Sequence, residues 1–250
     1  MFSNIFFKKV PYLRKLGIKI LKEAKEVVFL SEPYRNILLE KYLPNKLKED
    51  IHNKSHIIPN GIDEFWFNNM EKEKSESFDS KINLLQVGVL NKNKNVTSTI
   101  QAIRLLQSRG YNIKFTVVGE IENNKIYKNI RELDFIKYVP PKTKEELIQI
   151  YRENAIFVMP SITETFGLVY AEAMSQGLPV IYTKEQGFDK QFEEGVVGYS
   201  VDCFNPEEIS QNILGIIEKY NDISKNCIDL VKKFSWDRII EEYFNIYFTK

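Results

Sequence analysis

The stretch PSITETFGLVYAEAMSQGLPV, residues 160–180, decides the fold class of this chain. It directly follows the apolar run Ala155–Met159, which has the length of one buried strand and is flanked by polar residues. Further along, the small and apolar residues Ala171, Ala173 and Met174 predict a largely buried helix. A buried strand followed by a loop and a buried helix is the repeating unit of α/β proteins with a parallel sheet.

The same alternation continues through most of the chain. Segments of helical character separate short apolar segments that are typical of strands, expected at Ile82–Val87, Ile113–Val118, Phe135–Val139, Ala155–Met159 and Pro179–Tyr182. Gly110 is placed to end one helix, and Thr143 with Glu146 forms a capping box that begins another. We therefore expect residues 76–234 to form a Rossmann-like, doubly wound parallel sheet with helices on both faces.

Residues 1–75 show a shorter α/β pattern of their own. Strands are expected at Val27–Leu30 and His56–Pro59. Between them, a helix is expected to begin after Ser31 and to run through Tyr42.

Two further segments complete the expected organisation. The charged stretch Asn68–Ser80 has almost no aliphatic residues and is typical of a linker. After the sheet, residues 235–250 predict a last helix, from Trp236 to Tyr247, with apolar residues at helical spacing.

The composition disfavours several classes of protein. Lys plus Arg number 35 against 34 Asp plus Glu, so the net charge of +1 argues against a nucleic-acid partner. The isolated Cys203 and Cys227 indicate neither a disulfide framework nor a zinc site, and they suit a reducing cytoplasm. His52 and His56 have the spacing of a helical metal site, but the turn at Asn60-Gly61 follows too closely, so no metal or other cofactor is expected. No apolar run is long enough to span a membrane, and no secretory leader is expected.

Residues 1–25 are strongly basic. Seven Lys and Arg residues stand against the single acid Glu23, which gives this segment a charge of +6, and apolar residues recur among them at helical spacing. Two interpretations stay open. The segment is either an amphipathic helix in peripheral contact with the anionic inner membrane face, or a helix packed on a sheet with a solvated basic face.

Ligands of open parallel sheets bind beyond the carboxyl ends of the strands, where helix N-termini present free N–H groups. One candidate loop follows the first predicted strand and reads GVLNKNKN. In it, Gly88 allows close backbone approach, and Lys92 and Lys94 supply positive charge for a diphosphate. The alternative is that Lys92 and Lys94 are ordinary loop lysines that only contact solvent.

The second candidate loop lies within residues 160–180. Thr163 or Thr165 is expected to cap the following helix, and the backbone N–H groups of Phe166, Gly167 and Leu168 are then free to face a phosphate.

Two carboxylates belong to the same loop and helix. Glu164 precedes the helix and Glu172 lies within it, and a carboxylate can accept two hydrogen bonds from the vicinal hydroxyls of a sugar or ribose. The alternative is that both are ordinary surface acids. The apolar neighbours of Glu172 argue for burial instead, and a buried charge needs a partner.

At these residues the sequence resembles the family 4, or group 1, retaining glycosyltransferases of the GT-B fold. The segment Glu164-Thr-Phe-Gly-Leu-Val-Tyr-Ala-Glu172 matches the family's pair of glutamates separated by seven residues, and Gly177–Val180 and Ile58–Asp63 extend the agreement. The resemblance identifies residues 76–234 with the C-terminal nucleotide-sugar-binding domain. It identifies residues 1–75 with only the end of the N-terminal acceptor-side domain, onto which residues 235–250 cross back.

The resemblance implies a retaining, metal-independent transferase that moves a sugar from a nucleotide-sugar donor to a glycan or lipid-linked acceptor. Glu164 would bind the donor sugar hydroxyls, Lys94 and the helix N-terminus the diphosphate, and Glu172 the ribose. The catalytic residues would be Glu164 and Lys94, and the donor-binding residues would be Gly88, Lys92, Thr165, Phe166, Gly167, Leu168 and Glu172.

Two departures from the family pattern shape the expectation. Val89 stands where the family often has an arginine. The larger departure is length, since the sequence matches only the last elements of the family's N-terminal domain, and neither His52 nor His56 matches the usual catalytic histidine of that domain. We therefore expect either a truncated or split enzyme, with a partner chain or self-association, or a non-catalytic nucleotide-sugar-binding module that acts with a partner. A nicotinamide oxidoreductase is disfavoured because the first strand leads into GVLNKN rather than a GxGxxG turn.

Overall fold

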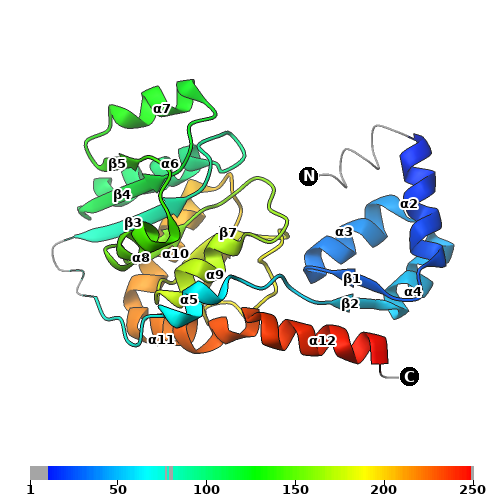
Figure 1. The fold of residues 1–250 in the computed structure, drawn as a ribbon. Coiled ribbons are helices and arrows are strands. Elements are labelled where there is room, and N and C mark those ends of the chain that lie inside the picture. Colours follow the sequence, from blue (N-terminus) through cyan, green and yellow to red (C-terminus); the bar gives the residue numbers. More distant parts are fainter. Residues whose placement is uncertain (1–10, 77, 79–80, 249–250) are drawn as a thin grey trace.

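The computed structural model describes residues 11–76, 78 and 81–248. Its elements form a large α/β unit and a smaller N-terminal unit, joined by an extended connection and by the last helix (Figure 1).

The large unit is built on a six-stranded sheet in the order β5-β4-β3-β6-β7-β8, with every neighbouring pair parallel. The strands are β3 (Ile82–Val87), β4 (Ile113–Val118), β5 (Ile136–Val139), β6 (Ile156–Val158), β7 (Val180–Thr183) and β8 (Gly198–Val201). The expected doubly wound parallel sheet is confirmed, and five of its strands lie where the apolar segments predicted them. The sixth, β8, was not expected.

Helices cover this sheet. They are α6 (Val96–Ser108), α7 (Asn124–Arg131), α8 (Lys144–Arg152), α9 (Leu168–Ser175), α10 (Pro206–Glu218) and α11 (Tyr220–Leu230), followed by a short 3₁₀ turn (Val231–Phe234). The capping box predicted at Thr143 is present, because its hydroxyl accepts from the Glu146 N–H and the Glu146 carboxylate accepts from the Thr143 N–H. Gly110 follows α6 with φ +91°, as expected for a residue that ends a helix.

The central strands explain why the sheet is stable. All three residues of β6 are fully buried, and β3 is buried at five of its six positions. Strands with apolar side chains on both faces need helices on both sides, since each face must be removed from water. The core therefore runs through the sheet, and the strand ends remain available for a site.

The N-terminal unit, as described from residue 11 onward, contains a two-stranded parallel sheet and three helices. Its elements are α2 (Pro11–Glu23), β1 (Val27–Phe29), α3 (Glu32–Tyr42), α4 (Asn45–Asn53) and β2 (Ser55–Ile57). Its own small core consists of Phe29, Leu38, Leu39, Leu43 and Ile51. Helix α4 was not expected, because only Leu47 and Ile51 give its sequence an apolar pattern.

His52 and His56, which have the spacing of a helical metal site, do not share a helix. His52 lies in α4, whereas His56 lies in β2, where its Nε2 is 2.8 Å from a carboxylate oxygen of Glu26. Among the described residues, no three His, Cys, Asp or Glu side chains gather in a way that could hold a metal ion.

The basic N-terminal helix has a mixed environment. Residues 1–10 lie outside the described part, so the interpretation of residues 1–25 can be followed only from α2 onward. In α2, Ile18 and Leu21 pack against the small core, whereas Leu16 and Ile20 are exposed. The helix therefore combines packing on one side with an exposed apolar stripe on another. None of the described helices has the length and apolarity needed to cross a membrane.

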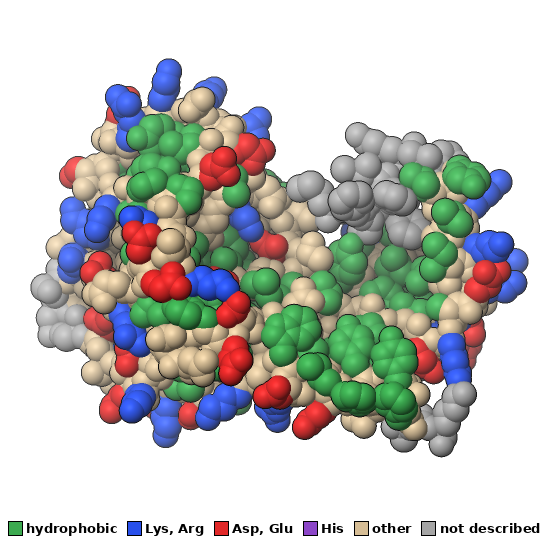
Figure 2. Space-filling model, in the orientation of Figure 1, with side chains coloured by type: hydrophobic (Ala, Val, Ile, Leu, Met, Phe, Trp, Pro, Cys, Tyr) green, Lys and Arg blue, Asp and Glu red, His purple; other side chains and the backbone are tan. Residues whose placement is uncertain are grey.

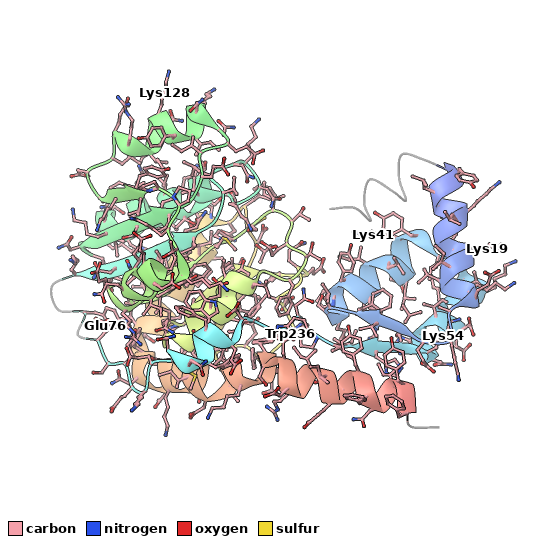
Figure 3. All side chains as sticks on the ribbon, in the orientation of Figure 1. Lys19, Lys41, Lys54, Glu76, Lys128 and Trp236 are labelled. Atoms are coloured by element: carbon pink, nitrogen blue, oxygen red, sulfur yellow. The ribbon has the colours of Figure 1, made fainter. Side chains whose placement is uncertain are left out.

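The two units are joined near Trp236. Residues 58–63 lead from β2 into a short helix, α5 (Glu64–Asn68), while α12 (Trp236–Phe248) runs back beside β2 (Figure 1). Figure 3 shows Trp236 at this crossing, and a side chain in place of Gly61 would put its Cβ 2.7 Å from the indole ring. The absence of a side chain at Gly61 thus lets the connection pass directly over α12.

Candidate functional site

The candidate site lies where the strand order reverses. From β3 the chain winds outward through β4 and β5, and after it returns in β6 it winds the other way through β7 and β8. At such a point the loops after two adjacent strands separate and leave a crevice that ligands occupy. Here the two loops are residues 88–95 after β3 and residues 159–167 after β6, the two loops that the sequence singled out.

Asparagine side chains hold these loops together. The amide of Asn93 both donates to the Thr163 carbonyl (2.8 Å) and accepts from the Thr163 N–H (3.1 Å). Asn95, buried and in the left-handed region at φ 50°, donates to the carbonyls of Pro160 (3.1 Å) and Cys203 (2.6 Å). These hydrogen bonds join the two loops to each other, although neither asparagine was predicted to contribute.

Lys94 and Glu164 meet across these two loops. The Lys94 Nζ donates to the Glu164 Oε2 over 2.6 Å, and the side chains are only 20% and 15% exposed. Gly88 lies beneath them with φ +152°, and a Cβ there would be 3.4 Å from Lys94 Cε. A charged pair in this shielded position provides one cation and one hydrogen-bond acceptor where the two loops meet.

The loop around Glu164 is fixed by the segment after β7. The Glu164 N–H donates to Gln186 Oε1 (3.0 Å), and the Glu164 carbonyl accepts from the Gly187 N–H (2.9 Å). A Cβ at Gly187 would overlap the Thr165 carbonyl, so close packing against the loop requires glycine there. These contacts set the backbone that presents the Glu164 carboxylate.

Helix α9 begins differently from the expectation. Neither Thr163 nor Thr165 caps it, so that prediction was wrong: the N-cap residue is Gly167, in the left-handed region at φ +79°. A Cβ at Gly167 would lie 2.5 Å from the Tyr170 ring, and a glycine can take both this conformation and this close approach.

Without a side-chain cap, the first N–H groups of α9 remain open. In the described part of the chain, the N–H groups of Phe166, Gly167 and Leu168 donate to no protein acceptor. The Phe166 ring is buried, whereas Thr165 is exposed and Leu168 is 40% exposed. Free N–H groups at a helix start favour an anion, because the helix dipole adds to their partial positive charge.

Glu172 is further into α9 and largely buried. Burial raises the pKa of the Glu172 carboxyl to about 7. The Tyr151 hydroxyl and the charge of Lys144 partly oppose this rise, because both favour the ionised form. The Tyr151 hydroxyl donates to Glu172 Oε2 over 3.2 Å. The buried acid thus has the partner that its apolar neighbours required, although nothing in the sequence pointed to Tyr151.

Lys92 stands apart from the other candidates. Its side chain is exposed, and its ammonium group makes no ion pair or hydrogen bond with a described residue. The structure therefore brings Lys94, Glu164, Gly88 and the start of α9 together but leaves Lys92 in solvent.

Comparison with known proteins gives the family. Residues 68–233 match the family model of the group 1 glycosyl transferases. The chain is 28% identical over 214 residues to an uncharacterised glycosyltransferase of Methanocaldococcus jannaschii, covering 82% of this chain and 56% of that relative. It is also 28% identical to the capsular polysaccharide biosynthesis glycosyltransferase CapM of Staphylococcus aureus, covering 73% of this chain and 50% of that relative. The chain thus spans about half the length of these relatives.

A solved structure shares the fold. The Anabaena protein HepE, solved in complex with UDP-glucose, superposes with a TM-score of 0.70 at 17% identity, covering 92% of this chain and 66% of that one. At this identity the similarity shows a common GT-B architecture.

Proposed function

Because this chain belongs to the group 1 glycosyltransferases, we propose that it transfers a sugar from a nucleotide-sugar donor to a glycan or lipid-linked acceptor, with retention at the anomeric carbon. The observation that carries this proposal is the Lys94–Glu164 pair beside the open N–H groups of α9.

In the proposed donor complex, the diphosphate lies at the start of α9. Its phosphate oxygens accept hydrogen bonds from the Lys94 ammonium and from the N–H groups of Phe166, Gly167 and Leu168. The exposed Thr165 lies beside these donors. Gly88 lets the diphosphate approach the backbone, since it has no side chain and its φ of +152° is a conformation that other residues rarely adopt. Lys92 would reach in from solvent only when an anion is present.

The two carboxylates bind the two sugar rings of the donor. Glu164 accepts hydrogen bonds from the donor sugar hydroxyls, and Glu172 accepts them from the ribose. Glu164 is paired with Lys94 in this structure. When the donor enters, Lys94 exchanges the carboxylate for phosphate oxygens and leaves Glu164 to the sugar.

Catalysis would then rest on stabilising the leaving diphosphate. As the glycosidic bond breaks, negative charge grows on the diphosphate and the sugar gains oxocarbenium character. A fixed ammonium and oriented N–H groups stabilise that growing charge without rearrangement. The same donors supply the positive charge that a metal ion would otherwise bring, so we propose metal-independent transfer.

Partners and location extend the proposal. We place the reaction in the cytoplasm, with α2 in contact with the inner membrane face where a lipid-linked acceptor would lie. UDP-glucose is the first donor to test, because HepE was solved with it.

The N-terminal unit supports a second candidate function. Its described part has a two-stranded sheet and a core of five buried residues, which is little structure for an acceptor cleft. A nucleotide-sugar-binding module that acts with a partner chain fits this observation as well.

Calorimetry and a transfer assay separate these possibilities. We expect the purified chain to bind UDP and UDP-glucose equally well with and without EDTA. Loss of binding in EDTA that magnesium or manganese restores would contradict metal independence. Donor binding without transfer to any glycan or lipid-linked acceptor would favour the non-catalytic module, and absence of all nucleotide binding would reject both.

A further inference from the structure

A large cavity lies beside the donor loops. It has a volume of about 850 Å³ and opens at the carboxyl ends of β7 and β8. Two of its lining residues also hold the donor site: Ile162, whose N–H donates to the Asn93 carbonyl, and Gln186, which accepts from the Glu164 N–H. The cavity therefore borders the loops of the proposed donor site.

The charge of the cavity differs from that of the donor crevice. It is lined by two lysines and five carboxylates, the latter being Glu185, Asp189, Glu194, Asp202 and Glu208, which gives a net charge of −3. A nucleoside diphosphate would be repelled here. An uncharged ligand rich in hydroxyl groups would instead find several hydrogen-bond acceptors.

Most of these carboxylates already have partners. Asp189 accepts from backbone N–H groups, Glu194 pairs with Ser200, Glu208 pairs with Lys184, and Asp202 accepts from the Phe204 N–H. Within the described chain, the Glu185 carboxylate alone among the five makes no hydrogen bond or ion pair. It is thus the acceptor most available to a ligand.

An exposed aromatic ring stands at the same cavity. Phe204 is 66% exposed although it lies in a turn held by the hydrogen bond from its own N–H to Asp202 (2.9 Å). An ordered ring left in water is unfavourable by itself, and a flat apolar surface such as the C–H face of a sugar ring would cover it.

The loop between β7 and β8 is held in an uncommon conformation. Glu185 and Lys190 both have positive φ, 58° and 63°, and apart from Asn95 they are the only non-glycine residues in the described chain that do. Buried Asp189 accepts from the N–H groups of both. Such conformations cost energy and concentrate at functional sites.

This loop also faces the N-terminal unit. Gln191 donates to the Leu30 carbonyl over 3.1 Å, and Glu185 and Lys190 line a second hollow together with residues of α3. The large cavity and this second hollow therefore share the loop residues Glu185, Asp189 and Lys190, and the second hollow lies between the loop and α3.

We propose that this cavity binds an uncharged sugar of the acceptor glycan, with Phe204 under the sugar ring and Glu185 accepting from its hydroxyls. The proposal rests on the proposed transferase function, and it identifies the chemical class of the acceptor: neutral rather than acidic glycans.

The test is a saturation-transfer NMR titration of the whole chain in saturating UDP. The probes are uncharged di- to tetrasaccharides of glucose, galactose, mannose and N-acetylated hexosamines, with a sulfated tetrasaccharide for comparison. We expect at least one uncharged probe to bind in the millimolar range or tighter, and the sulfated probe to bind at least about tenfold more weakly. Phe204→Ala should weaken the bound probe roughly tenfold, and Glu185→Gln several-fold.

A matched variant is Tyr111→Ala. It removes another exposed aromatic side chain, which does not line the cavity, and it should leave glycan affinity unchanged. Binding of no uncharged probe in saturating UDP, or equal effects of the Phe204 and Tyr111 variants, would overturn the proposal. UDP affinity is measured in the same samples. UDP binding without glycan binding rejects the cavity alone, whereas glycan binding without UDP binding rejects the donor site alone.

Discussion

The Lys94 ammonium lies 2.6 Å from a carboxylate oxygen of Glu164, 70 residues away in the chain. In the proposed reaction these two groups separate to serve opposite ends of the donor. While no donor is bound, each of the two charges has the other as its partner. This pairing matters because both side chains are largely shielded from water, and a shielded charge without a partner is costly.

Replacing Lys94 should weaken diphosphate binding. A charge-assisted hydrogen bond contributes about 1.5 to 3 kcal/mol, so Lys94→Ala should raise the Kd for UDP roughly ten- to a hundredfold. Calorimetry measures this. Lys128→Ala is the matched control, because it removes an exposed lysine of α7, which packs beside the edge strand β5 rather than at the centre of the sheet (Figure 3). An unchanged Kd in the Lys94 variant would remove that residue from the site.

Replacing Glu164 should separate binding from transfer. Glu164→Gln keeps the size of the side chain but frees Lys94 from its negative partner, so UDP should bind as tightly as before or up to about tenfold more tightly, the equivalent of one charged hydrogen bond. Transfer from UDP-glucose should fall by at least about a hundredfold. Weaker UDP binding in this variant would contradict an assignment of Glu164 to the sugar.

The sequence predicted the sheet well, because short, mainly apolar segments alternate with helical segments along this part of the chain. It missed β8, whose sequence GYSV begins with glycine and has only two apolar residues, one of them partly exposed. It also missed α4, because Leu47 and Ile51 are the only apolar residues in that helix. Both elements are defined mainly by tertiary contacts, which local pattern does not contain.

The candidate site was foreseen in its loops but not in its contacts. Burial of Glu172 implied a partner, yet the identity of Tyr151 depends on how α8 packs against α9. The Lys94–Glu164 pair likewise depends on β3 and β6 being neighbours in the sheet. The threonine caps failed because the close approach of Tyr170 requires glycine at the start of α9.

Nucleotide binding should depend on pH through Glu172. Burial raises the pKa of this carboxyl to about 7, so a large fraction is protonated at pH 6 and little at pH 8. The ionised form accepts from both ribose hydroxyls, whereas the acid form gives up part of that capacity. UDP should therefore bind several-fold more tightly at pH 8 than at pH 6. Glu172→Gln should bind more weakly and lose this part of the pH dependence.

The stability of the chain should change in the opposite direction. Because the pKa of Glu172 rises from 4.5 to about 7 on folding, the folded state holds this proton more tightly than the unfolded state. The associated stability is fully present below about pH 4.5 and is lost as the pH rises to about 7, by up to about 3 kcal/mol. Urea unfolding from pH 5 to 8 should show a steeper decline in the wild type than in Glu172→Gln. Parallel curves would contradict the raised pKa.

The basic helix α2 should bind anionic membranes. Tyr12, Leu16 and Ile20 are spaced four residues apart and are 73%, 41% and 59% exposed, which provides an apolar stripe among the basic residues. Each Lys or Arg near an anionic surface adds about 1 kcal/mol, so sedimentation with phosphatidylserine vesicles should exceed that with neutral vesicles and fall in high salt. Leu16→Ser with Ile20→Ser should reduce it. Equal sedimentation with both vesicles at low salt would reject membrane contact.

Helix α12 should make the chain self-associate. Figure 2 shows apolar side chains gathered over this helix, and Trp236, Ile240, Phe244, Tyr247 and Phe248 are 45% to 75% exposed. Ile239 is the only fully buried residue of this helix and Tyr243 and Ile246 are half-buried, so most of the large apolar side chains of α12 are exposed. A contiguous patch of this kind on a folded protein favours contact with another surface.

A second copy of the chain is the partner that a purified sample always contains. We therefore expect the mass in analytical ultracentrifugation to rise with concentration, and Phe244→Glu to shift the distribution toward monomer because burying an unpaired carboxylate in such a contact is unfavourable. Tyr111→Glu places the same charge on another exposed aromatic position and should leave the mass unchanged. A wild-type chain that stays monomeric at all concentrations would show that α12 has no partner in a second copy.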